Sequence, residues 1–119
     1  MKVVIAGSRN IVDRLGLVKA IKQSGFDITE VVSGKARGVD TMGETWAVAN
    51  DIPIKQFPAD WSKHGNAAGP IRNSMMAEYA DAAIIIWDGK SAGTLNMIKN
   101  MHMLDKPYFI RMSFNATSK

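Results

Sequence analysis

Two glycines that flank two basic residues form the segment best suited to bind an anion. Gly34 and Gly38 enclose Lys35 and Arg37, and they follow a short β-branched run. Small residues let backbone N–H groups approach a phosphate, and the N-terminus of a following helix adds partial positive charge. A basic side chain between the glycines can neutralise the bound group. The segment predicts an anion-binding loop, although a plain strand-to-helix turn has similar residues.

A second and a third loop have a similar composition. Gly7, Ser8 and Arg9 follow the first apolar run, and the segment 88–94 follows another, 82–87. The third loop is the most suited to a phosphate, because it contains glycine and threonine directly before a helix-compatible segment. Its threonine would either cap that helix or donate its hydroxyl to a phosphate oxygen. The third-loop residues expected to bind are Asp88, Gly89, Ser91, Gly93 and Thr94.

Neither of two standard nucleotide motifs is present. A Walker A loop that ended in Gly89-Lys90-Ser91 would need a glycine where Ile84 stands. The dinucleotide pattern G-x-G-x-x-G fails after Gly7, because Ser8, Arg9 and Asn10 follow it. The sequence therefore disfavours NAD bound in the usual Rossmann manner, and no cofactor is predicted.

A central arginine is the best candidate for gripping an anionic group. Arg72 and Asn73 are expected in the first turn of a helix, beside a long loop. Arginine can hold a phosphate or a carboxylate through two parallel hydrogen bonds. The alternative is a surface arginine that pairs with Glu78 or Asp81.

Four other side chains each allow a binding role and a structural one. Trp61 would stack on a base or fill the core, and the core is favoured. His64 would contact phosphate or act as an acid, but a lone loop histidine is more often solvated. Asp60, next to Trp61, would likewise have either a binding role or a structural one. Asp40 would bond a ribose hydroxyl or cap its own helix.

Hydrophobic spacing and turn residues predict strands that alternate with helices. Such alternation implies right-handed crossovers and a parallel sheet covered on both faces. The run Ile84-Ile85-Ile86 fits a strand buried on both sides. The fold class predicted is α/β, a small Rossmann-like three-layer sandwich with a five-stranded parallel sheet. Expected strands are 2–6, 28–33, 53–57, 82–87 and 107–112; expected helices are 11–23, 39–49, 71–79 and 94–103; 58–70 is expected to be a loop and 113–119 a fraying polar tail.

Length and composition restrict the class of protein. The 119 residues, 46% of them hydrophobic, fit one domain, expected over residues 1–112. Without cysteine, and with only His64 and His102 far apart, neither a disulfide nor a metal site is expected. The net charge of +4 favours phosphate-bearing partners without identifying them. No long apolar segment begins the chain, so we expect no membrane association and a cytoplasmic location.

The three loops together resemble those of the SLOG superfamily, specifically the small YspA/YpsA-related group of Rossmann-like proteins. The resemblance is carried by Gly7-Ser8-Arg9, by the segment 33–41 and by the segment 57–94, and it extends from Lys2 to about Arg111. It implies a nucleotide or nucleotide-derived ligand at the carboxyl edge of the sheet, and self-association into a homo-oligomer. Within the superfamily, LOG enzymes release the base from a nucleoside monophosphate, Smf/DprA relatives bind single-stranded DNA, and others sense or sequester signalling nucleotides.

The LOG pattern has an arginine ahead of a helix and then P-G-G-x-G-T-x-x-E, and this chain departs from it at the position of the final glutamate. Arg72, Gly93 and Thr94 match it, whereas Met97 replaces the glutamate. Cleavage of a glycosidic bond through an oxocarbenium-like state needs a carboxylate, which a thioether cannot replace. Asp40, Glu44 or Asp88 would have to substitute. Binding without catalysis is therefore preferred to hydrolysis, for which Arg72, Asp40 and Asp88 are the catalytic candidates.

The leading expectation is a sensor or sequestering protein that recognises phosphate and ribose. The small-molecule ligand would be nucleotide-like. Single-stranded DNA ranks last, because only Trp61 and Tyr79 offer rings for stacking bases. The predicted ligand-binding residues are Gly7, Ser8, Arg9, Gly34, Lys35, Arg37, Gly38, Asp40, Asp60, Trp61, His64, Arg72, Asn73, Asp88, Gly89, Ser91, Gly93 and Thr94.

Overall fold

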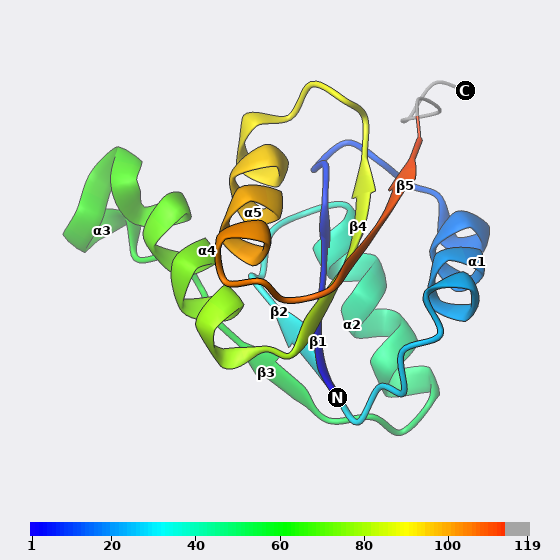
Figure 1. Cartoon of the computed structure of the whole chain (residues 1–119). Helices are drawn as coiled ribbons and strands as arrows, with labels where there is room; N and C mark the ends of the chain where they lie inside the picture. The colour runs from blue at the N-terminus through cyan, green and yellow to red at the C-terminus, as the bar shows by residue number, and fades with distance from the viewer. Residues whose placement is uncertain (114–119) are drawn as a thin grey trace.

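A computed structural model of the chain describes residues 1–113 and contains one five-stranded sheet. All neighbouring strands are parallel, and their order is β3-β2-β1-β4-β5. Figure 1 shows the helices in two layers, one on each face of this sheet. The predicted α/β sandwich with five parallel strands is confirmed. The strands are β1 (Lys2–Gly7), β2 (Glu30–Ser33), β3 (Ile54–Gln56), β4 (Ala82–Trp87) and β5 (Tyr108–Met112).

Each helical layer covers its own hydrophobic core. Helices α1 (Arg14–Ser24) and α2 (Val39–Ala49) pack on one face, and α4 (Ala68–Tyr79) and α5 (Ala92–Met103) pack on the other. Along β1, Val3 and Ile5 enter the first core while Val4 and Ala6 enter the second. Strands β1 and β4 are therefore buried on both sides, which explains their apolar sequences.

The strand order reverses between β1 and β4. From β1 the chain adds β2 and then β3 on one side, after which β4 returns to the other side of β1. Open parallel sheets hold ligands at the carboxyl edge beside such a reversal. Gly7 ends β1 at this point, and a Cβ there would lie 2.1 Å from the carbonyl oxygen of Ile86. Glycine thus lets the ends of β1 and β4 approach each other.

The segment expected to be a loop over residues 58–70 is instead largely helical, so that prediction is wrong. It contains the short helix α3 (Trp61–His64), the 3-10 turn η1 (Gly65–Ala67) and the first turn of α4. Helix α4 begins at Ala68, three residues before the predicted start. Pro70 is its third residue, where the missing N–H would have had no partner within the helix, so the proline does not break it.

Other boundaries differ by a few residues. Helix α1 begins at Arg14 rather than Ile11, because Asp13 caps it by accepting a bond from the N–H of Gly16. Helix α5 begins at Ala92 rather than Thr94. Strand β2 begins at Glu30, two residues later than expected, while β3 and β5 are slightly shorter than predicted.

The end of the described chain is held to the sheet. Ser113, expected to begin a fraying tail, is buried, and its N–H donates to the carbonyl of Trp87 at 2.8 Å. The rest of that predicted tail, 114–119, lies outside the described residues. Within residues 1–113, no helix is long and apolar enough to cross a membrane.

Candidate functional site

Two adjoining cavities lie at the carboxyl edge of the sheet. The first cavity, of about 290 Å³, is lined by the end of β1, the start of α5 and the facing side of α4. The second cavity, of about 300 Å³, lies between the loop after β2 and the segment that leads into α3. Arg9, Ala36, Trp61 and Arg72 line both cavities.

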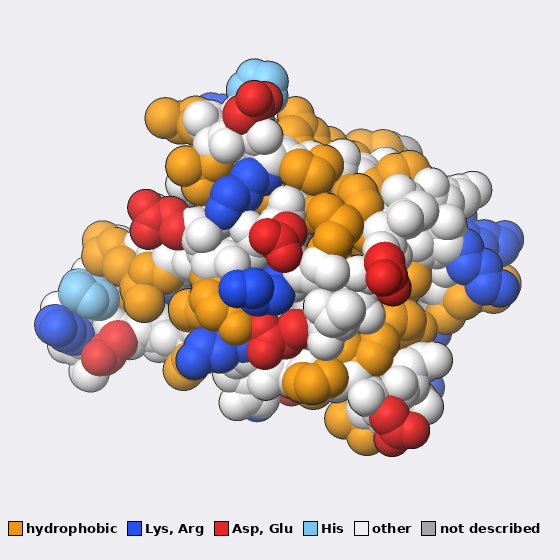
Figure 2. Space-filling model, turned by 60° about the horizontal axis from the view of Figure 1, so that its bottom comes forward, with side chains coloured by type: hydrophobic (Ala, Val, Ile, Leu, Met, Phe, Trp, Pro, Cys, Tyr) orange, Lys and Arg blue, Asp and Glu red, His pale blue; other side chains and the backbone are white. Residues whose placement is uncertain are grey.

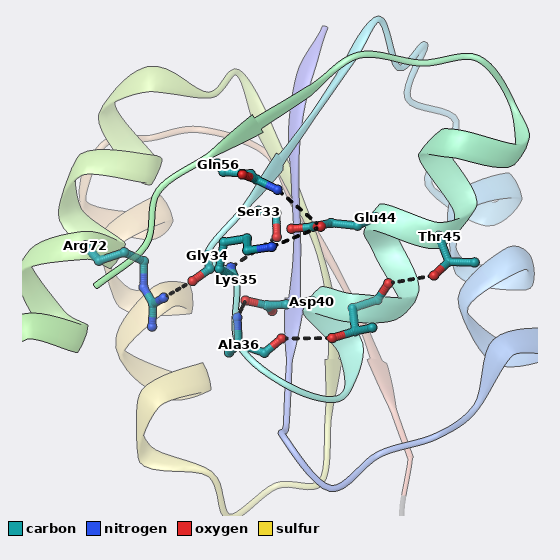
Figure 3. A network of polar contacts seen from close by, with 10 residues as sticks. Ser33, Gly34, Lys35, Ala36, Asp40, Glu44, Thr45, Gln56 and Arg72 are labelled. Atoms are coloured by element: carbon teal, nitrogen blue, oxygen red, sulfur yellow. Dashed lines mark hydrogen bonds and ion pairs between the residues drawn. The ribbon is translucent and has the colours of Figure 1, made fainter. Parts of the chain in front are cut away.

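The loop after β2 is held in place by its own polar contacts (Figure 3). The N–H of Lys35 donates to the hydroxyl of Ser33 at 3.1 Å, and its ammonium lies 3.8 Å from the carboxylate of Glu44. Lys35 has a φ of +62°, a left-handed conformation that is uncommon for residues with a Cβ. Backbone strain of this kind concentrates at functional sites.

Gly38 joins this loop to the one after β1. Its φ is +74°, and a Cβ there would lie 2.4 Å from the carbonyl oxygen of Arg9. A second link runs from the loop after β1 to the loop after β4, since the N–H of Asp88 donates to the hydroxyl of Ser8 at 3.2 Å. The three glycine-containing loops thus meet at one edge, as their positions after parallel strands predicted.

Arg72 reaches from α4 across to the loop after β2 (Figure 3). Its Nη1 donates to the carbonyl of Gly34, and its Nε donates to Oδ1 of Asn73 at 3.0 Å. Burial lowers the pKa of Arg72, while the charge of Asp40 opposes that shift. The alternative pairing with Glu78 or Asp81 is wrong, and Arg72 lies in the second turn of α4 rather than the first.

Asp40 is a buried carboxyl on the wall of the first cavity. Its Oδ2 accepts a bond from the N–H of Ala36 at 3.2 Å, so it braces the preceding loop. No side chain caps α2 at Gly38, and the capping role considered for Asp40 is not what the structure shows. Burial raises the pKa of Asp40 from 3.8 to about 6, although Arg72 and the Ala36 N–H favour its ionised form.

The start of α5 forms another wall of the first cavity. Ser91 is the N-cap, and its hydroxyl accepts bonds from the N–H of Thr94 at 3.4 Å and the hydroxyl of Thr94 at 3.0 Å. Thr94, considered as the cap, is instead the third residue of the helix. Within residues 1–113 the N–H groups of Ala92 and Gly93 have no hydrogen-bond acceptor, which leaves them available to an anion.

Asp88 organises the loop that leads to this helix. One of its carboxylate oxygens accepts bonds from the N–H groups of Lys90 and Ser91, both at 2.8 Å. These bonds lower the pKa of Asp88. It lines neither cavity, so its position favours a structural role over the catalytic role considered for it.

Two amide side chains on the wall of the first cavity, those of Asn73 and Asn96, connect α4 to α5. Asn73 is buried, and its Nδ2 donates to the carbonyl of Gly93 at 3.2 Å and to Oδ1 of Asn96 at 3.0 Å. Asn100 in turn donates to the carbonyl of Asn96 at 2.9 Å. These bonds fix the start of α5 relative to Arg72.

Trp61 is not the core residue that the sequence favoured. Its side chain is 51% exposed and lines both cavities. Asp60, one residue earlier, caps α3 by accepting a bond from the N–H of Lys63 at 3.1 Å, and the hydroxyl of Ser62 lowers its pKa. His64 ends α3, half-buried, and lines neither cavity.

The structure therefore brings together most, but not all, of the predicted binding residues. Twelve line at least one cavity: Gly7, Arg9, Gly34, Lys35, Arg37, Asp40, Trp61, Arg72, Asn73, Ser91, Gly93 and Thr94. Ser8, Gly38, Asp60, His64, Asp88 and Gly89 line neither, and Ser8, Gly38, Asp60 and Asp88 have the structural contacts described above.

The apolar and amide part of the cavity walls was not predicted from the sequence. Met97, for which no binding role was predicted, is buried and also lines the first cavity. Asn96 could have been recognised from the sequence as part of a polar helix face, since Asn100 follows four residues later on the same face. The missed lining residues are Ala6, Ala36, Pro58, Ala59, Gly69, Pro70, Met76, Ala92, Asn96 and Met97.

Within residues 1–113, no group of three or more histidine and acidic side chains is arranged to hold a metal ion. The cavities instead offer cations, amides and backbone N–H groups, which suit a phosphate-bearing organic ligand.

Comparison with known proteins adds independent information. Residues 1–64 match the model of the family described as YspA, cpYpsA-related SLOG, and this match includes the loops after β1 and β2. The Gene 61 protein of Mycobacterium phage D29 is 32% identical over 108 residues, which cover 82% of this chain and 86% of the relative. No solved structure matches the chain significantly. The chain therefore belongs to the YspA, cpYpsA-related SLOG family, the group that its motifs resemble.

Proposed function

We propose that this protein binds a nucleotide or nucleotide-derived ligand and acts as a sensor or sequestering protein. Membership of the SLOG family suggests a nucleotide-related role. The observation that carries the proposal is the first cavity, where Arg72, Asp40 and the start of α5 face one space at the point where the strand order reverses.

The phosphate group would lie at the start of α5. The N–H groups of Ala92 and Gly93, unpaired within residues 1–113, and the partial positive charge of the helix N-terminus favour an anion there. Arg72, which lines the same cavity, adds a full positive charge, and its partial burial strengthens its attraction for an anion. A Cβ at Gly93 would meet no atom within 4 Å, so there is room for a ligand beside the helix.

The sugar and the base would occupy the rest of the first cavity. Asp40 presents a buried carboxyl that can accept hydrogen bonds from ribose hydroxyls. Trp61 offers an exposed ring on which a base can stack, and Pro70 and Met76 also line this cavity. A mostly apolar cavity with a few placed polar groups is typical of small-molecule sites.

Thermal unfolding with a panel of nucleoside monophosphates, dinucleotides and cyclic nucleotides tests the proposal. A ligand at 100 times its dissociation constant adds about 2.7 kcal/mol of stability, which moves the melting temperature of a domain this size by roughly 10 °C. Arg72→Ala should reduce the shift, while Lys19→Ala, at an exposed position of α1, should retain it. An unchanged melting temperature with every nucleotide would contradict the proposal.

A second function, hydrolysis of the N-glycosidic bond of a nucleoside monophosphate, is favoured by one observation. Asp40 has the burial, the raised pKa and the cavity position expected of a catalytic carboxyl. In that reaction water would add at the sugar carbon, releasing the free base and ribose 5-phosphate. Met97 argues against it, since the LOG-type glutamate is absent there.

Chromatography of the same samples separates the two functions. Binding with no free base supports a sensor or sequestering protein. Release of base that Asp40→Asn abolishes, while the thermal shift persists, would establish the hydrolase instead.

A further inference from the structure

The second cavity has a different chemistry from the first. Among residues 1–113, four basic side chains and no carboxylate line it, and it shares lining residues with the first cavity. Each cavity is close to the lower end of the sizes usual for small-molecule sites. The basic residues are Arg9, Lys35, Arg37 and Arg72.

These four cations lie close together with few local partners. Within residues 1–113 the guanidinium groups of Arg9 and Arg37 have no hydrogen-bond or ion-pair partner in the protein. Arg9 is near enough to Arg72 to lower the pKa of Arg72 by repulsion. Lys35 is paired with Glu44, but at 3.8 Å and with its side chain 46% exposed. An anion in this space would relieve repulsion between like charges.

This concentration of charge is local. Figure 2 shows the end of the molecule at which the strands begin, away from the carboxyl edge. Basic and acidic side chains are mixed there with hydrophobic ones. The net charge of the whole chain is only +4. A generally basic surface therefore does not account for the four cations around the second cavity.

We infer that the second cavity is a second anion subsite, and that the ligand is a nucleotide with a pyrophosphate or a second phosphate group. The inference rests on the proposed function, because it places the nucleoside monophosphate part in the first cavity. The further phosphate would lie between Arg9, Lys35 and Arg37, with Trp61 and Arg72 at the boundary between the two cavities.

Calorimetric titrations with AMP, ADP and ADP-ribose at one salt concentration test this subsite. Each hydrogen bond to a charged group changes an affinity by about tenfold or more, so ADP and ADP-ribose should bind at least about tenfold more tightly than AMP. Arg37→Ala should remove about tenfold of that gain while changing AMP affinity by less than about twofold. Arg37 has no protein partner within residues 1–113, so this variant should fold normally.

Lys19→Ala controls for the loss of one positive charge, because Lys19 lies on α1 and lines neither cavity. It should leave all three affinities unchanged. Equal affinities for AMP and ADP, or an equal loss for both in Arg37→Ala, would overturn the second subsite while leaving the proposed function standing. Failure of all three nucleotides to bind, and of the same series with the other bases, would contradict both.

Discussion

Asp40 is the residue in which burial and charge conflict most strongly. It is 5% exposed, and the positive charge of Arg72 does not offset the cost of removing a carboxylate from water. Its pKa is therefore raised to about 6. A bound phosphate nearby would favour the protonated form further, because two negative charges repel.

This raised pKa predicts a pH dependence of stability. The folded state disfavours ionised Asp40. The contribution of Asp40 to the unfolding free energy is therefore fully present below the unfolded pKa of 3.8 and is lost as the pH rises through about 6. Between about pH 4 and pH 7.5, wild type should lose roughly 2 kcal/mol of unfolding free energy relative to Asp40→Asn. Urea denaturation of both proteins measures this difference. Parallel pH profiles would show that Asp40 titrates normally.

Gly93 allows the first cavity to be filled without disturbing the core. A Cβ there meets no atom within 4 Å, and leucine is a better helix former than glycine. Gly93→Leu should therefore fold with unchanged or slightly higher stability while weakening nucleotide binding by about tenfold or more. Lys99→Leu adds the same side chain to an exposed site on α5 and should bind normally. Wild-type affinity in Gly93→Leu would place the ligand elsewhere.

At the scale of elements, the position of α4 is fixed by a lysine that follows α5. The ammonium of Lys106 donates to the carbonyls of Ala77, Glu78 and Ala80 at 2.8, 2.9 and 2.8 Å. Carbonyls at a helix C-terminus lack partners within the helix and attract cations. Since α4 carries Arg72 and Asn73, this contact supports the site from the far end of the helix.

Replacing that lysine should destabilise the fold. Lys106→Met keeps much of the side-chain length but leaves three carbonyls without their donor, which should lower the unfolding free energy by about 2 kcal/mol. Lys99→Met, at an exposed position of α5, should stay within about 0.5 kcal/mol of wild type. Urea denaturation measures the change in unfolding free energy of both variants, provided that their m values equal that of wild type. Equal stability of the two variants would show that the Lys106 contact contributes nothing.

Elements with clear periodicity were predicted most accurately. Helix α2 and strand β4 have the predicted bounds, because spacing of apolar residues marks one and an unbroken apolar run marks the other. The segment 58–70 failed, since its glycines and prolines are typical of loops. Only the position of Pro70 within the first turn of α4 makes that proline compatible with a helix.

At the scale of the molecule, the topology assembles the site. The loops after β1, β2 and β4 are distant in sequence, yet parallel strands bring them to one edge, and this followed from the sequence. The division into two cavities did not, because it depends on how far Arg72 and Trp61 reach across from α4 and α3. Local patterns cannot predict such side-chain reach, nor that Met97 would face both a core and a cavity.

Chemical-shift mapping of backbone amides during titration with a nucleoside monophosphate is the most direct test of the central claim. A chain of 119 residues is well suited to this measurement. The largest changes should fall on the walls of the first cavity, including Gly7, Ala36, Arg72, Gly93 and Thr94. Changes confined to other parts of the chain, or none at saturating ligand, would contradict a nucleotide site at the carboxyl edge of the sheet.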